Sequence, residues 1–139
     1  MSLILLGLAV ITPTHWVVLG QGDEPTLIPF TDETYSIQGL VPEGWNEIAP
    51  GVYARALTMT DVALVAEQST PGTLETTLNA LVPQLGLTEA PESVGTVESD
   101  ALTWVLYQVD VVTVQVDLGL AEADGKTYIV VLQASSDEY

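Results

Sequence analysis

The chain has 139 residues, a length typical of one domain, and 47% of them are hydrophobic, so it can bury a core. It carries 19 acidic residues but only two basic residues, one histidine and no cysteine, for a formal net charge of −17. Most catalytic arrangements need a histidine base, a thiolate, a lysine amine or an arginine clamp, and this composition excludes almost all of them. Nucleic acid and anionic membrane surfaces are excluded as partners, because two basic residues cannot neutralise either.

The acidic excess leaves metal cations, cationic partners or simple solubility as its roles, and solubility is the ordinary role of surface charge. The absence of cysteine removes disulfides, zinc–thiolate sites and thiol nucleophiles. It fits a cytoplasmic protein and an exported protein without disulfides equally well.

The N-terminal segment is apolar at residues 3–11 and again at 16–19, with Thr, Pro, Thr and His between the two runs. A signal peptide would carry basic residues before its apolar run, and there are none. A membrane helix needs about 20 apolar residues, and the break interrupts that length. Both membrane interpretations are therefore weak.

The same segment matches the C-terminal part of the chain. Residues 6–9 (LGLA) recur as residues 118–121, and the apolar run that follows lies at the same offset in both places. Internal repeats indicate a duplicated structural unit. We predict that residues 1–21 form a β-hairpin that repeats the C-terminal hairpin at 112–133. It is either the tail of a preceding copy of the domain or an added hairpin that extends the sheet.

Residues 22–32 are rich in proline and turn residues and are predicted to be a linker, so that the main domain spans residues 33–139. Apolar and β-branched residues that alternate with polar ones then predict short strands. These strands are expected at residues 35–41, 45–48, 52–57 and 62–67.

One helix is predicted after these strands. Thr70 is the candidate N-cap, and Pro71 takes the first helical position, which favours proline. Leucine and valine at positions 74, 78, 81, 82 and 85 form one apolar face at helical spacing. Pro83 weakens the last turn, and Gly86 is the expected left-handed stop.

Further strands are expected at residues 93–98, 102–109, 112–120 and 128–133. Asp124 and Gly125 between the last two predict a tight hairpin turn, because both residues tolerate positive φ. The order of elements indicates an α+β fold: an antiparallel sheet of about six to eight strands with one main helix packed on it. A C-terminal helix could begin at residues 137–139, and the sequence leaves open whether the domain lacks it.

Residues 35–45 (YSIQGLVPEGW) resemble the opening of PsbP-like domains, in which an alternating strand is followed by Pro-x-Gly-Trp and a short strand. The order of strands and helix through Gln133 is also similar to that family, and the resemblance covers about residues 33–135. The chain is similar, too, to acidic bacterial modules of this type that occur beside a serine α/β-hydrolase domain.

The resemblance implies an accessory or binding module. PsbP-like proteins act in the photosynthetic oxygen-evolving complex and as a partner of the Ran GTPase, and no catalytic residue set exists to carry over. The basic surface residues that those proteins use are mostly absent here, which puts their particular partners in doubt. The sequence has no Gly-x-Ser-x-Gly motif, so the chain is not itself the neighbouring hydrolase.

Aromatic residues are the first candidates for a binding site. Trp45 follows the Pro-Glu-Gly turn, where it either lines a ligand pocket or plugs the end of the core, and the core role is commoner. Trp104 and Tyr107 point to opposite faces of one predicted strand. We therefore expect at most one of them to be deeply buried, with Trp104 in the core.

Among the polar candidates, Arg55 is the one guanidinium. It either clamps the carboxylate of a ligand or, as surface arginines usually do, forms an ion pair with a neighbouring acid. His15 is expected to be exposed in the turn of the N-terminal hairpin. Trp16 joins Trp45 and Arg55 as a possible ligand or interface residue, and no catalytic, cofactor-binding or metal residue is predicted.

Acidic pairs invite a calcium hypothesis. They are Asp23/Glu24, Asp32/Glu33, Glu98/Asp100 and Glu122/Asp124. Calcium needs about six to eight oxygens that converge on one point, and no pair has the spacing of a calcium-binding loop. Glu98 and Asp100 are also disfavoured as a glycosidase-like carboxylate pair, because a turn would keep both solvated.

We therefore predict a non-enzymatic PsbP-like accessory or protein-interaction module of a larger protein, without a cofactor. Its partner is expected to be another protein: an unrelated chain, a second copy in a dimer formed by strand pairing, or an adjacent hydrolase domain of the parent. The parent is expected to be exported or membrane-attached, with a cytoplasmic protein as the alternative. A small-ligand or calcium-binding domain with an acidic pocket is the alternative function.

Overall fold

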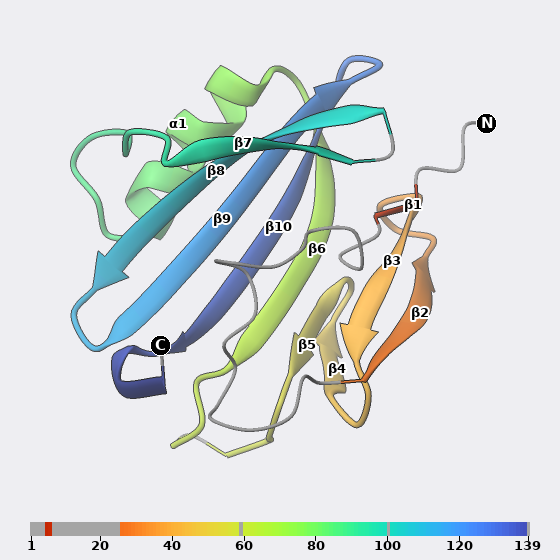
Figure 1. Ribbon diagram of the computed structural model, residues 1–139, viewed down its shortest axis with the longest axis vertical. Helices are drawn as coiled ribbons and strands as arrows, with labels where there is room; N and C mark the ends of the chain where they lie inside the picture. The colour runs from red at the N-terminus through yellow and green to blue at the C-terminus, as the bar shows by residue number, and fades with distance from the viewer. Residues whose placement is uncertain (1–4, 7–25, 59, 100, 139) are drawn as a thin grey trace.

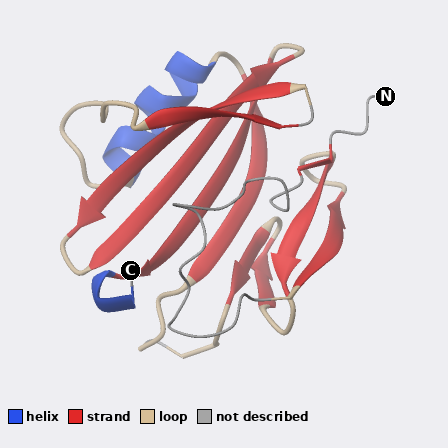
Figure 2. Cartoon of the chain, viewed as in Figure 1, coloured by secondary structure: helices blue, strands red, loops and turns tan. Residues whose placement is uncertain are grey.

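The computed structural model of the chain describes residues 5–6, 26–58, 60–99 and 101–138 (Figure 1). Within these ranges the chain forms one α-helix and two β-sheets. Strands make up most of the structure (Figure 2). This architecture confirms the predicted α+β fold class, in which one main helix packs on a mostly antiparallel sheet.

The large sheet has seven strands in the order β4-β5-β6-β10-β9-β8-β7, and every neighbouring pair is antiparallel. Its strands are β4 (Asn46–Ala49), β5 (Val52–Ala54), β6 (Leu64–Pro71), β7 (Gly95–Ser99), β8 (Leu102–Val111), β9 (Val114–Ala123) and β10 (Lys126–Ser135). The last three follow one another as hairpins, which is the simplest antiparallel connection. A short 3-10 helix (Ser136–Glu138) follows β10.

The small sheet is formed by β1 (Leu5–Leu6), β2 (Leu27–Asp32) and β3 (Ile37–Pro42). β3 lies in the middle, antiparallel to β2 and parallel to β1. The linker predicted at residues 22–32 is therefore wrong for residues 27–32, which pair along β3. Pro29 is tolerated within β2 because this strand lies at an edge of its sheet.

The predicted N-terminal hairpin lies outside the described residues, apart from Leu5 and Leu6. These two residues pair with Gln38 and Gly39 of β3 in the small sheet. The repeat of residues 112–133 at the N-terminus and the division into domains therefore stay predictions.

The predicted helix is present as α1 (Leu74–Gln84), but it begins later than expected. Its N-cap is Thr73, whose hydroxyl accepts a hydrogen bond from the Thr76 backbone N–H at 3.2 Å, while the Thr76 hydroxyl oxygen accepts one from the Thr73 N–H at 3.1 Å. This reciprocal capping box satisfies two free N–H groups of the first turn. Thr70 and Pro71 are wrong as the helix start, because they complete the pairing of β6 with β10.

The end of the helix is as predicted. Gly86 has a φ of 72°, the left-handed conformation that favours glycine, and its N–H donates to the Pro83 carbonyl at 3.2 Å. No helix in the described ranges is both long and apolar enough to cross a membrane, since α1 has only 11 residues.

Both faces of the large sheet are covered by other elements. α1 packs on one face, in a cluster formed by Leu78, Tyr107, Leu118, Leu120 and Ile129. The small sheet covers the opposite face, in a cluster formed by Ile37, Leu102, Trp104, Ala121, Tyr128 and Val130. The core is therefore divided by the large sheet into two layers.

Trp104 and Tyr107 show the consequence of this arrangement. They lie on opposite faces of β8, as predicted, and Trp104 belongs to the core. The expectation that at most one of them is deeply buried is wrong, because each is only 5% exposed. A strand that is covered on both faces buries consecutive side chains, not only alternate ones.

Two hairpin turns differ in how well their residues suit the backbone. Asp124 and Gly125, between β9 and β10, have φ values of 54° and 75°, which confirms the predicted turn. Val112, between β8 and β9, has a φ of 57° although it is β-branched, and it is 97% exposed. A β-branched residue in this region is strained, and its exposed side chain has no packing to offset the strain.

We expect Val112→Asn to stabilise the protein, because asparagine adopts a positive φ more readily than valine. The free energy of unfolding in urea should rise by about 1 kcal/mol. The reciprocal change Asp124→Val places a β-branched residue in the next hairpin turn and should lower it by a similar amount. A Val112→Asn protein that is no more stable than the parent would contradict strain at this turn.

Candidate functional site

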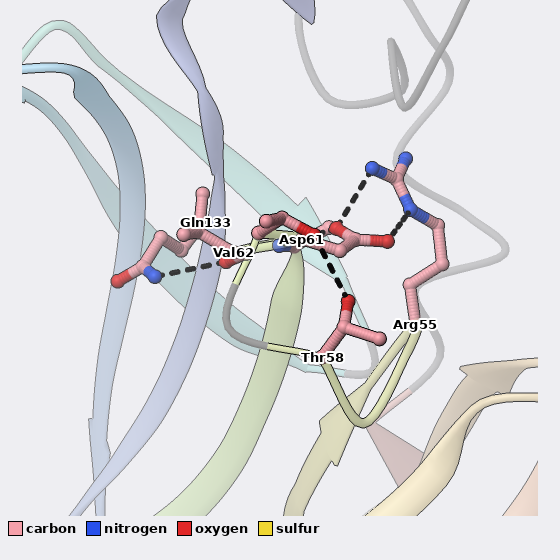
Figure 3. A network of polar contacts seen from close by, with 7 residues as sticks. Arg55, Thr58, Asp61, Val62 and Gln133 are labelled. Carbon is pink, nitrogen blue, oxygen red and sulfur yellow. Dashed lines mark hydrogen bonds and ion pairs between the residues drawn. The ribbon is translucent and has the colours of Figure 1, made fainter.

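An ion pair joins Arg55, which follows β5, to Asp61 in the loop before β6 (Figure 3). Nε of Arg55 donates to Oδ2 of Asp61 at 2.7 Å, and Nη2 donates to Oδ1 at 2.8 Å. The geometry is bidentate, and the two side chains are 30% and 20% exposed. The expectation that Arg55 pairs with a neighbouring acid at the surface is confirmed; a role in ligand binding stays a prediction.

The loop between β5 and β6 is held in place by two hydrogen bonds in addition to this ion pair. Oδ1 of Asp61 accepts a hydrogen bond from the Ala63 N–H at 3.0 Å, and Gln133 of β10 donates through Nε2 to the Val62 carbonyl at 2.9 Å (Figure 3). The hydrogen bonds from the Arg55 guanidinium and the Ala63 N–H hold the pKa of Asp61 below its usual value.

An open pocket of about 330 Å³ lies beside this ion pair. Its lining residues are Arg55, Thr60, Asp61, Val62, Ser135 and Asp137. Its polar groups are hydroxyls, carboxylates and the Arg55 guanidinium, and no histidine, lysine or cysteine is among the lining residues. Of the two carboxylates, that of Asp61 is engaged in the ion pair with Arg55. This lining suits contact with a small polar group better than a chemical step.

Asp61→Asn tests what the ion pair contributes. We expect the free energy of unfolding near neutral pH to fall by about 1 kcal/mol, the upper end for a partly exposed pair. Because the pKa of Asp61 is lowered in the folded protein, this stabilisation is present above the unfolded pKa and is lost as pH falls through the folded pKa.

Urea denaturation of the two proteins at several pH values checks this prediction, and the curves should converge once pH falls below the lowered pKa of Asp61. Asp110→Asn is the matched control, since it removes the same charge from an exposed position on β8. An Asp61→Asn protein as stable as the parent at neutral pH would show that the pair contributes nothing.

Glu67 of β6 is an acidic residue buried between the two sheets. Its side chain is 0% exposed, and neither carboxyl oxygen has a hydrogen-bond partner among the described residues. Burial raises the pKa of Glu67 to about 9, so the carboxyl is protonated and neutral at pH 7. The sequence analysis did not single out this residue. The sequence feature that indicates its burial is its position two residues after Val65 in a predicted strand, because residues two apart in a strand point to the same face.

Two glycines lie close to Glu67, one against its carboxyl group and one against its backbone. A Cβ atom on Gly39 of β3 would overlap Oε2 of Glu67 and would lie 2.7 Å from Cε1 of Phe30. Gly51 lies beside the Glu67 backbone, where its carbonyl accepts a hydrogen bond from the Glu67 N–H at 2.7 Å. A Cβ atom on Gly51 would overlap the Glu67 carbonyl oxygen.

Gly39→Ala should therefore destabilise the protein by about 1–3 kcal/mol, the usual cost of overpacking a filled core. If the contact with Glu67 is the cause, the double variant Gly39→Ala/Glu67→Ala should recover part of the loss. The four proteins of this cycle are compared by urea denaturation, and the interaction energy should exceed about 0.5 kcal/mol. If the effects of the two single substitutions on the free energy of unfolding are additive, the loss in Gly39→Ala does not come from contact with Glu67.

The aromatic and imidazole candidates do not gather at one place. Trp45 is half-buried in the turn before β4, where its backbone N–H donates to the Pro42 carbonyl at 3.3 Å. It belongs neither to the two buried clusters nor to the pocket lining. Its role as a core plug or ligand contact stays a prediction. Trp16 and His15 lie outside the described residues.

The acidic pairs are used by the fold where they are described. Asp32 accepts a hydrogen bond from the Tyr35 N–H at 2.9 Å, and Glu98 accepts one from the Thr103 hydroxyl at 2.7 Å. Glu122 accepts one at 2.8 Å from the N–H of Leu74, the first residue of α1. In the described part of the chain, no three His, Cys, Asp or Glu side chains are placed to share a metal ion.

The two edges of the large sheet differ. The pairing of β4 with β5 shifts register between Glu47 and Ala49, and such a bulge makes an edge a poor template for another strand. β7 pairs with β8 in unbroken register from Gly95 to Ser99, and in the described structure no strand lies on its other side. The side chains of Thr96 and Glu98 on β7 are exposed. The β7 edge thus presents backbone groups that another chain can pair with.

The structural comparison agrees with this architecture, which is that of the PsbP-like α+β fold. The solution structure of cyanobacterial PsbP (CyanoP) from Synechocystis sp. PCC 6803 is similar to this chain with a TM-score of 0.51 and 13% sequence identity. The similarity covers 93% of this chain and 88% of that chain. Comparisons with protein-family models and with curated proteins gave no match. The PsbP-like expectation is thus confirmed for the fold.

Proposed function

We propose that this chain is a non-catalytic accessory module that binds another protein through the β7 edge. The observation that carries this proposal is the unbroken, exposed edge of β7 opposite the bulged edge of β4. A partner strand added there would gain backbone hydrogen bonds without any change in the large sheet. The parent protein would be exported or membrane-attached.

Charge around the β7 edge selects the kind of partner. Residues 85–111, which include β7 and β8, contain acidic side chains and no basic one. Of these, Glu89, Glu92, Glu98 and Asp110 are exposed. A partner segment rich in Lys or Arg is therefore favoured at low salt, whether it belongs to a separate protein or to an adjacent domain such as a hydrolase.

The alternative partner is a second copy of this chain, which pairs one of its own strands with the β7 edge. Each copy carries a formal charge of −17, so two copies repel each other at low ionic strength. Salt shortens the range of this repulsion to about 3 Å at 1 M. Strand-paired dimers are therefore expected at high salt and not at low salt.

Because the chain has no cysteine, a single introduced one can carry a spin label at a known place. We expect a label on Thr96→Cys of β7 to lose mobility when a peptide of alternating Lys and Val is added at low salt. The same label should show spin–spin broadening when the protein dimerises at high salt, with the dimer itself followed by sedimentation. These results would locate both kinds of partner at the β7 edge.

A label on Glu47→Cys of β4 is the matched control, since this residue is exposed at the opposite edge of the same sheet. It should respond to neither the peptide nor the salt. Equal responses at both positions would reject the β7 edge as the binding surface. No response at either position would reject strand pairing as the function.

A further inference from the structure

Glu67 has no part in the β7 edge or in the pocket beside Arg55, yet it lies where the two sheets meet. Its carboxyl group sits over Gly39 of β3, next to the ring of Phe30 from β2. That ring contacts Tyr53 of β5, with 5.2 Å between the ring centroids. Among the side chains that lie between the large and small sheets, Glu67 is therefore an acid without a hydrogen-bond partner among the described residues.

Among the described residues, the strands that enclose Glu67 bring no positive charge close to its carboxyl group. β3 carries no titratable side chain, and Val130 is the residue opposite Glu67 on β10. The titratable residues on the other enclosing strands are Asp32 on β2, Glu47 on β4, Tyr53 on β5, and Tyr128 and Lys126 on β10. Lys126 lies at the far end of β10, opposite Pro71. An ionised Glu67 would thus have acidic neighbours and an apolar enclosure.

This electrostatic setting also acts on Tyr53. Its pKa is raised first by burial and then by the charges of Glu47, Asp32 and Glu67. Tyr53 therefore stays a neutral phenol in the same range of pH and adds no negative charge of its own beside Glu67.

We propose that Glu67 is a proton-binding site that locks the small sheet onto the large sheet. With the proton bound, the neutral carboxyl is tolerated between the sheets. When the proton leaves, the charge cannot remain in this apolar layer, and β2 and β3 separate from β6 so that water can reach it. The closed structure is thus favoured by acid and opened by base.

The direction follows from the two pKa values. In the closed structure the pKa of Glu67 is about 9, whereas in the opened structure the carboxyl has its ordinary value of 4.5. Below the ordinary value both states hold the proton and pH has no effect. Between the two values the opened state alone is ionised, so the equilibrium constant for opening rises about tenfold for each pH unit.

Infrared spectroscopy of the unmodified protein gives the first test. At pH 7 the spectrum should contain the C=O stretch of a protonated carboxylic acid, and this band should disappear as pH rises through about 9. The band should be absent from Glu67→Gln at every pH above about 6. A spectrum of the unmodified protein at pH 7 without this band would overturn the proposal.

Amide hydrogen exchange gives the second test, with protection factors corrected for the pH dependence of the intrinsic rates. Relative to the amides of β8 and β9, those of β2 and β3 should lose protection by about a hundredfold between about pH 6 and about pH 8. In Glu67→Gln this relative loss should vanish, because the amide does not titrate. If Glu67→Gln does not fold, Glu67→Met serves the same purpose with an apolar side chain.

Glu92→Gln is the matched control, because it removes one charge from an exposed residue and leaves Glu67 in place. It should keep the pH dependence of the unmodified protein, which separates the effect of Glu67 from general repulsion among the acidic residues. The same pH dependence in the Glu67 variants as in the unmodified protein would overturn the proposal. So would a uniform loss of protection in both sheets.

Discussion

The structure depends on one constraint: the central strands of the large sheet bury side chains on both faces, most of them apolar, and both faces must be covered. β9 buries six successive residues, Val116 to Ala121, which no strand with a water-facing side can do. α1 supplies one cover and the small sheet supplies the other. α1, the one α-helix of the described residues, lies on one face only, so β2 and β3 take the place that further helices have in parallel α/β folds.

The distribution of polar groups follows from this constraint. Most of the acidic side chains lie in turns, loops and edges, where water or local backbone N–H groups satisfy them. Glu67 is different, because the second cover passes directly over it and leaves its carboxyl without water. A residue that would be an ordinary surface acid on a half-exposed sheet thereby becomes a neutral group inside the protein.

Fold and function are connected only loosely in this chain. A fold shared with cyanobacterial PsbP at 13% identity defines an architecture, and a fold of this kind does not by itself specify a partner. The features that point to protein binding are local ones: a regular β7 edge and acidic surroundings without a basic residue. The excess of acidic over basic residues also bears on the proposed partner, since a surface of this charge attracts cationic segments and repels anionic ones.

The sequence by itself determined the α+β class, the antiparallel order, the turn at Asp124 and Gly125, and the helix stop at Gly86. Each of these depends on local periodicity or on the φ values that a residue tolerates, and both are determined by residues that are close together in the sequence. Only the tertiary structure decided that residues 27–32 form β2, that Tyr107 is buried together with Trp104, and that Glu67 is enclosed at Gly39. These outcomes depend on which distant strand lies across each face, and a side chain's local sequence does not record what will cover it.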